Sequence, residues 1–156
     1  MIDLDRFKAI NDEHGHAAGD QLLRGVGAAL RGRLRETDVL GRLGGDEFVA
    51  YLPHVGAAAA LAVAEQLLEV IRDASAALGD GMHTTASVGV AVDSTSSPAP
   101  DAMLRAADGA MYVAKRAGGN RASVAQRPAR SRKHPRTAEA APVSSLRGRP
   151  VRDPVV

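Results

Sequence analysis

The sequence predicts an α/β sandwich of ferredoxin-like type, in which helices flank a central, mostly antiparallel sheet. Short apolar runs typical of strands alternate with longer segments whose apolar residues recur every three or four positions. Two of the strand-like runs flank a Gly-Gly turn, which predicts a hairpin. The predicted order of elements is β-α-α-β-β-α-β-α-β, and the pattern ends near residue 125.

The first segments predict a strand end and two helices. Residues 1–4 are apolar apart from one aspartate and are predicted to end a strand. A short helix is predicted over 7–13, followed by a turn at Gly15. Residues 18–35 carry leucine and valine at helical spacing and predict a longer helix.

The middle of the chain predicts the hairpin and a long helix. Residues 39–43 and 48–52 form the two strands, and the glycines between them suit a tight turn. An alanine-rich segment, 57–78, has one continuous apolar face and predicts a helix that ends before Gly79.

Three further elements complete the predicted sandwich. Residues 84–92 are rich in β-branched side chains and predict a strand. A helix is predicted over 100–117, where a Gly-Gly pair ends it, and a last short strand over 121–124.

The charges divide the chain in two. Residues 126–156 contain eight Lys and Arg, two Asp and Glu, and five of the eight prolines. We expect this segment to be a disordered, basic, Pro/Arg-rich tail. Residues 1–125 carry more acidic than basic side chains. The chain has only four aromatic residues, so we expect nucleic-acid contact to be limited to non-specific binding by the tail.

Cysteine is absent from the chain. Its absence excludes a disulfide framework, a thiolate metal site and a cysteine nucleophile, and suits a reducing compartment. No signal peptide or membrane-spanning pattern is visible in the sequence. We therefore expect a cytoplasmic domain.

Carboxylates follow the first strand and occupy the hairpin turn. If the two strands are neighbours, Asp3 and Asp5 meet Asp46 and Glu47 at one end of the sheet. Clustered carboxylates repel one another unless a cation lies between them, and hard oxygen ligands suit Mg²⁺. The carbonyl of Leu4 is a further candidate ligand. The alternative is structural, with Asp5 capping a helix, Asp46 in a turn and Glu47 in solvent.

Five blocks of the sequence resemble the GGDEF family of diguanylate cyclases. They are residues 3–12, 15–20, 42–48, 86–91 and 107–115, and the hairpin at 44–48 reads Gly-Gly-Asp-Glu-Phe. The resemblance covers about residues 1–125 and implies a nucleotidyl-cyclase-like variant of the predicted fold. Blocks in this order and spacing are far more specific than a lone motif.

The resemblance implies a reaction and a metal. Such enzymes condense two GTP into cyclic di-GMP and release two pyrophosphates, with two domains facing each other as a homodimer. By this resemblance, Asp3, Asp46 and the Leu4 carbonyl hold Mg²⁺ or Mn²⁺. Asp46 and Glu47 are the catalytic carboxylates: Asp46 accepts the proton of the 3′-hydroxyl, and Glu47 supports the metal.

The resemblance also implies substrate-binding residues. Asn11 and Asp20 match residues that read guanine, whose N1–H and exocyclic amine suit a carboxylate acceptor. Gly44 and Gly45 leave room for phosphate and ribose beside the backbone.

Three basic side chains have two interpretations each. Lys8 and Lys115 match phosphate-binding lysines, although a lysine at a helix end is usually only solvated. His16 lies in the loop of the guanine readers and either assists them or bonds the turn backbone.

A regulatory site is implied by Arg35 and Asp38. Their Arg-x-x-Asp pattern before the Gly-Gly pair resembles the family's inhibitory site for its product, cyclic di-GMP. The guanidinium of arginine can donate two parallel hydrogen bonds to a phosphate or to a guanine edge. The alternative is an arginine at a helix C-terminus followed by a turn aspartate.

The sequence departs from the family pattern in two places. Gly119 stands where the family often has a phosphate-binding arginine, so we expect weaker GTP binding. Family members also carry a helix and the start of the first strand before the Asp-x-Asp segment, whereas this sequence begins inside that strand. We expect exposed apolar surface, unpaired backbone groups, poor solubility and low turnover. The alternative function is a catalytically impaired module that binds GTP or cyclic di-GMP in signalling.

Overall fold

The computed structural model describes residues 1–79, 81–93 and 99–125. The tail predicted to be disordered, 126–156, lies outside the described residues. The elements follow the predicted order. They are β1 (Ile2–Leu4), α1 (Phe7–His14), α2 (His16–Arg33), β2 (Val39–Gly44), β3 (Glu47–Tyr51), α3 (Ala57–Ala76), β4 (Ala86–Val90), α4 (Pro100–Arg116) and β5 (Arg121–Val124).

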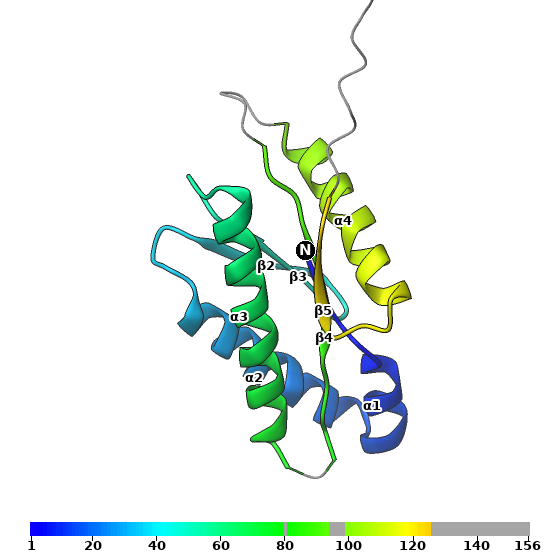
Figure 1. Cartoon of the computed structure of the whole chain (residues 1–156). Helices are drawn as coiled ribbons and strands as arrows, with labels where there is room; N and C mark the ends of the chain where they lie inside the picture. The colour runs from blue at the N-terminus through cyan, green and yellow to red at the C-terminus, as the bar shows by residue number, and fades with distance from the viewer. Residues whose placement is uncertain (80, 94–98, 126–156) are drawn as a thin grey trace, which may run out of the picture.

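The strands form one five-stranded sheet in the order β2-β3-β1-β4-β5 (Figure 1). β1 lies at the centre and runs antiparallel to both β3 and β4. β2 and β3 form the predicted antiparallel hairpin, and β4 pairs with β5 in parallel. The prediction of a mostly antiparallel sheet is confirmed.

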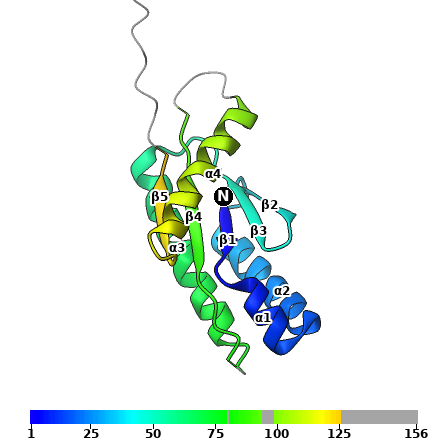
Figure 2. The same ribbon diagram turned by 90° about the vertical axis from the view of Figure 1, so that its right-hand side faces the viewer.

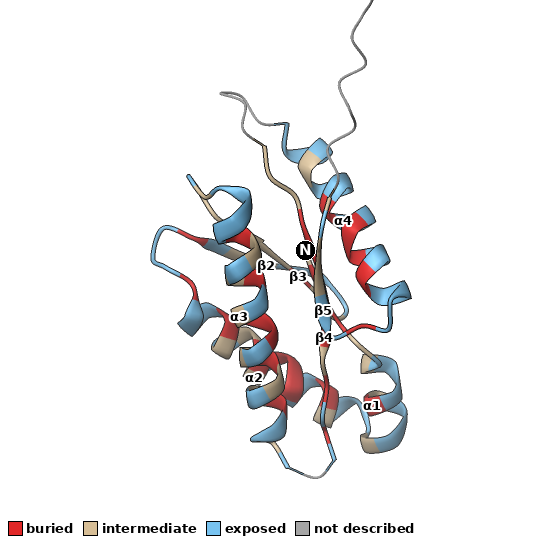
Figure 3. Ribbon diagram, in the orientation of Figure 1, coloured by how far each residue is buried: buried red, intermediate tan, exposed pale blue. Residues whose placement is uncertain are grey.

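Helices cover both faces of the sheet. Figure 1 shows α2 and α3 on one side and α4 on the other, and Figure 2 shows α1 at the lower end of β1. The main core fills the space between the sheet and α2 with α3, where Ile2 and Leu4 of β1 are almost fully buried. The buried stripes of the helices face the sheet in Figure 3.

Most elements differ from the prediction by one or two residues at an end, and two of these differences have a visible cause. The second helix begins at His16 instead of residue 18, because Gly15 (φ +82°) turns the backbone between two helices within one residue. β4 is shorter than the predicted strand 84–92. Thr84 lies outside it and its hydroxyl donates to the carbonyl of Asp5 at 2.8 Å.

The structure contains an apolar cavity next to the first strand. The cavity, of about 960 Å³, adjoins Met1 between α3 and α4. Among the described residues, no helix combines the length and apolar character that a membrane span requires.

Candidate active site

A pocket of about 420 Å³ lies at the C-terminal end of β1. Its lining includes three acidic and two basic side chains that the sequence singled out, with Leu4 beside them: Asp3, Asp5, Asp46, Lys8 and Lys115. β1 contributes Asp3, the hairpin contributes Asp46, and the two lysines come from α1 and α4. The predicted convergence of these carboxylates at one end of the sheet is present in the structure.

Asp3 is the most buried carboxylate of the site, with 5% of its surface exposed. Its register partner on β3 is Glu47, so the two side chains lie on the same face of the sheet. Burial raises the pKa of Asp3, and the nearby charges of Asp46 and Glu47 raise it further. Lys115 opposes these effects, with its Nζ 2.7 Å from Asp3 Oδ2.

The hairpin turn places Asp46 beside Leu4. The Leu4 amide donates to the Asp46 carbonyl at 3.3 Å, which anchors the turn to β1. Gly45 takes a left-handed conformation (φ +50°) that favours glycine. The Arg42 Nε donates to the Gly45 carbonyl at 2.9 Å, across an irregularity in the pairing of β2 and β3.

The donor set suits a divalent cation that completes its shell with other ligands. Over residues 1–79, 81–93 and 99–125, no three acidic or histidine side chains stand close enough to enclose a metal ion by themselves. Mg²⁺ commonly uses one or two carboxylates together with substrate phosphates. Asp3 and Asp46 are such a pair, and the ammonium of Lys115 at Asp3 shows that this position attracts a cation.

Asp5 has a role that sequence reasoning missed. Its carboxylate accepts hydrogen bonds from the Thr85 and Ser87 hydroxyls. It also accepts one from the backbone amide of Asn120, at 2.9 Å. It is not a helix cap, since the residue before α1 is Arg6 in a left-handed conformation (φ 58°). Asp5 ties the end of β1 to β4 and to the turn before β5. The sequence signal for this cluster was a pair of hydroxyl residues two positions apart, Thr85 just before β4 and Ser87 within it.

Gly119 is packed against Asp5. A Cβ placed on Gly119 would lie 2.7 Å from Asp5 Oδ2, and the glycine itself has φ +70°. The backbone conformation and the close contact with Asp5 therefore both favour glycine at position 119, where the sequence departs from the family pattern.

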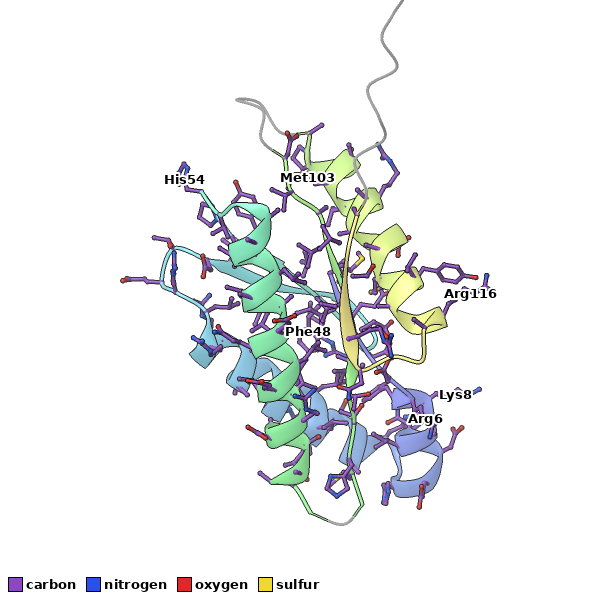
Figure 4. The ribbon with its side chains drawn as sticks, viewed as in Figure 1. Arg6, Lys8, Phe48, His54, Met103 and Arg116 are labelled. Carbon is purple, nitrogen blue, oxygen red and sulfur yellow. The ribbon has the colours of Figure 1, made fainter. Side chains whose placement is uncertain are left out.

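The predicted guanine readers lie outside the lining of this pocket. Asn11 is half-buried on α1, while Asp20 and His16 are exposed on the first turns of α2. The two helices approach closely at Gly19, where a Cβ would overlap the Asn11 side chain. The structure thus places Asn11 against α2, and the adjoining Lys8 extends outward from α1 in Figure 4.

The Arg-x-x-Asp segment forms an ordered turn after α2. Asp38 is 6% exposed, and its Oδ2 accepts a hydrogen bond from the Arg35 amide at 2.9 Å. The Arg35 side chain is exposed. Arg31, which sequence reasoning missed, donates to the carbonyls of Asp38 (2.7 Å), Leu34 and Arg35. Three carbonyls bound by one guanidinium fix the shape of the turn.

A family model described as "Diguanylate cyclase, GGDEF domain" matches residues 1–121. The chain is 45% identical over 119 residues to the diguanylate cyclase TpbB of Pseudomonas aeruginosa, a match that covers 74% of this chain and 27% of TpbB. The chain therefore spans about a quarter of the length of that relative.

Solved structures agree with this family. The crystal structure of the GGDEF domain of TpbB has a TM-score of 0.68 at 38% identity and covers 81% of this chain and 80% of that one. The GGDEF domain of DgcB from Caulobacter crescentus, in complex with cyclic di-GMP, has a TM-score of 0.72 at 27% identity, covering 80% of this chain and 74% of that one.

Proposed function

The chain belongs to the GGDEF family of diguanylate cyclase domains, and we propose that it condenses two GTP into cyclic di-GMP with release of two pyrophosphates. The observation that supports this activity is the meeting of Asp3, Asp46, Lys8 and Lys115 around one pocket. Acidic and basic side chains in one pocket suit a nucleoside triphosphate bound together with a divalent cation. Because GTP is the substrate, the domain works in the cytoplasm.

The residues that fit a metal are Asp3, Asp46 and the Leu4 carbonyl. Bound there, Mg²⁺ or Mn²⁺ supplies positive charge that neutralises phosphate and lowers the pKa of a neighbouring hydroxyl. The burial of Asp3 excludes water from one side of the carboxylate, which strengthens its attraction for any cation.

Asp46 is the proposed acceptor of the 3′-hydroxyl proton. It is half-buried in the pocket, and its backbone is held by the bond from Leu4. The deprotonated 3′-oxygen forms a bond to the α-phosphorus of the other GTP, and the bond from that phosphorus to the β-phosphate bridging oxygen breaks. Pyrophosphate leaves with the electron pair. Glu47, opposite Asp3, adds negative charge that holds the metal.

Other residues bind and select the substrate. Lys8 and Lys115 neutralise the triphosphate, and Gly44 and Gly45 leave the turn open to ribose and phosphate. Asn11 and Asp20, with His16 beside them, form hydrogen bonds with the guanine edge, as acceptors and as donors. In this proposal the base lies along α1 and α2, and the phosphates lie in the pocket.

Catalysis requires two copies of the domain. One pocket presents one GTP, so the second α-phosphate comes from a facing copy related by a two-fold axis. We expect the initial rate to rise with the square of protein concentration while the dimer is the minor species.

Arg35 and Asp38 form the proposed inhibitory site for cyclic di-GMP. The exposed Arg35 guanidinium suits a phosphate or a guanine edge, and the turn that carries it is fixed by Arg31. Product bound there would slow turnover.

The test is product formation from GTP and MgCl₂, followed by chromatography. The full chain is expected to produce cyclic di-GMP, and Asp46→Asn to lower the rate at least a hundredfold while retaining the far-UV CD spectrum. Asp73→Asn, an exposed carboxylate change on α3, is the matched control and should leave the rate unchanged. An equally active Asp46→Asn would contradict the proposal.

A binding module is the alternative function. The observation that favours it is the ordered turn after α2, where Arg35 is exposed and Arg31 donates to three carbonyls, because this site lies apart from the pocket. Saturable binding of cyclic di-GMP that Arg35→Ala abolishes, with no product from GTP at any protein concentration, would identify the chain as a receptor.

A further inference from the structure

Arg6 lies between the end of β1 and the start of α1, where it lines the pocket of the proposed active site. It is a third basic side chain of this lining, beside Lys8 and Lys115. Figure 4 shows Arg6 and Lys8 close together at the end of α1 that is nearest the sheet. No role has yet been given to Arg6, and three observations point to one.

The first observation is the backbone of Arg6. It is left-handed (φ 58°, ψ 23°), a conformation that residues other than glycine rarely adopt. The Arg6 carbonyl accepts the amides of Ala9 (2.9 Å) and Ile10 (3.3 Å) and so begins α1. Glycine would meet this backbone requirement with less strain. A long charged side chain at a strained position beside a pocket points to a function for that side chain.

The second observation is that the Arg6 guanidinium is unpaired. Within the part of the chain that the structure describes, it has no hydrogen-bond or ion-pair partner. The adjacent carboxylate, Asp5, already accepts three hydrogen bonds from other groups. Asp3 is bound by Lys115 at 2.7 Å. The N–H donors of Arg6 are therefore available to a ligand in the pocket.

The third observation is that the neighbouring arginines bind elsewhere. Arg116 on α4 lies over the ring of Tyr112, with its Cζ 5.9 Å from the ring centre, and Figure 4 shows it on the outer side of α4. The Nε of Arg121 donates to the Gly119 carbonyl at 3.1 Å. Among the described residues that line the pocket, Arg6 is the arginine.

The charges of the pocket call for such a cation when it holds a triphosphate and a divalent ion. The carboxylates of Asp3 and Asp46 offset the charge of the ion, so the phosphates depend on basic side chains. Lys8 and Lys115 together offset the singly charged inner phosphates. The terminal phosphate carries a charge of about −1.5 to −2 near pH 7 and needs a further partner.

We propose that Arg6 binds the β- and γ-phosphates of GTP through its guanidinium. In the proposed reaction the α-phosphorus lies beside Asp46 and the metal, on the hairpin side of the pocket, whereas Arg6 comes from the α1 side. Arginine presents two parallel N–H donors to phosphate oxygens, a geometry that lysine lacks. This inference rests on the proposed function, because it concerns the same pocket, and it adds a residue that selects for a triphosphate.

The experiment measures binding without turnover. The ligand is 3′-deoxy-GTP, which keeps the triphosphate but lacks the hydroxyl that attacks the other nucleotide. Isothermal titration calorimetry of the full chain in MgCl₂ gives its affinity, and 3′-deoxy-GMP, which ends at the α-phosphate, is the reference ligand. We expect Arg6→Gly to weaken the binding of 3′-deoxy-GTP by about tenfold, and that of 3′-deoxy-GMP by less than about twofold.

The variants separate charge, geometry and folding. Arg6→Gly suits the left-handed backbone, so its Tm should be no lower than that of the parent. Arg6→Asn is a second neutral variant, since asparagine also tolerates this conformation. Arg6→Lys keeps the charge without the paired donors and should have an intermediate affinity. Arg24→Ala, an exposed arginine change on α2 outside the pocket lining, is the matched control and should bind as the parent does.

Equal affinity of Arg6→Gly and the parent for 3′-deoxy-GTP would overturn the proposal and leave the proposed function intact. An equal loss for 3′-deoxy-GMP would contradict it as well, because Arg6 would then contact the α-phosphate or the ribose. An equal loss in Arg24→Ala would show that general positive charge is responsible. A parent chain that does not bind 3′-deoxy-GTP would contradict the proposed function itself, so the two failures are distinguishable.

Discussion

Asp3 holds a negative charge in a buried position beside two other carboxylates. This arrangement favours the binding of a cation and lowers the stability of the folded chain. Without metal, Lys115 compensates this charge, from a half-exposed position. We predict that Asp3→Asn raises Tm by about 2–4 °C, equivalent to roughly 1 kcal/mol, because like-charge repulsion is removed. The same variant should lose the rise in Tm that MgCl₂ with a GTP analogue produces in the parent.

Thermal unfolding followed by CD, with and without MgCl₂ and the analogue, measures both effects. Asp73→Asn serves as the control. A lower Tm in the absence of ligand would show that the Lys115 ion pair outweighs the repulsion.

Gly119 is a second residue whose identity the structure explains. We predict that Gly119→Ala destabilises the chain by about 1–3 kcal/mol, since the left-handed backbone disfavours a side chain and the new Cβ would press on Asp5. Urea unfolding measures the change. In a double-mutant cycle with Asp5→Ala, the cost should be less than additive. Full additivity would show that the loss of stability in Gly119→Ala comes from the backbone conformation alone and not from the contact with Asp5.

The order of elements was predictable from the sequence because each one carries its own periodicity. The hairpin, the apolar face of α3 and the turn at Gly15 depend on local sequence patterns, and the structure confirms them. The relation of Asn11 and Asp20 to the pocket was not predictable, because it depends on how closely α1 packs on α2 at Gly19. The Asp5 cluster joins residues 80 and more positions apart, which no local pattern encodes.

The turn after α2 allows a prediction about regulation. Arg31→Ala removes the guanidinium that binds three carbonyls of the turn, so Arg35 and Asp38 lose their fixed spacing. We expect the cyclic di-GMP concentration for half-inhibition to rise at least fivefold with an unchanged initial rate. Arg33→Ala, two residues along the same helix, is the control. Unchanged inhibition in Arg31→Ala would show that the shape of this turn does not affect inhibition by cyclic di-GMP.

At the scale of the whole molecule, the buried amino group of Met1 predicts a pH-dependent stability. Its pKa falls from 8.0 to about 6 in the folded chain because burial disfavours the charged form. Between these values the unfolded chain binds more protons than the folded chain, so stability rises from pH 6 to pH 8. Two pKa units correspond to at most about 2.7 kcal/mol.

Urea unfolding of the 156-residue chain across this range, beside an N-acetylated sample, measures the contribution. The acetylated chain has no titrating amino group and should lack this part of the pH dependence. The same slope in both samples would show that another group causes it.

The place of β1 in the sheet also determines which part of the molecule opens first. Among the described residues, the strand order links the β2–β3 hairpin to β4 and β5 through β1. The hairpin is thus a candidate unit of local unfolding, and its amides should exchange with solvent hydrogen sooner than those of β4. Since Asp46 belongs to the hairpin turn, each such opening would separate it from Asp3, the other proposed metal-binding carboxylate.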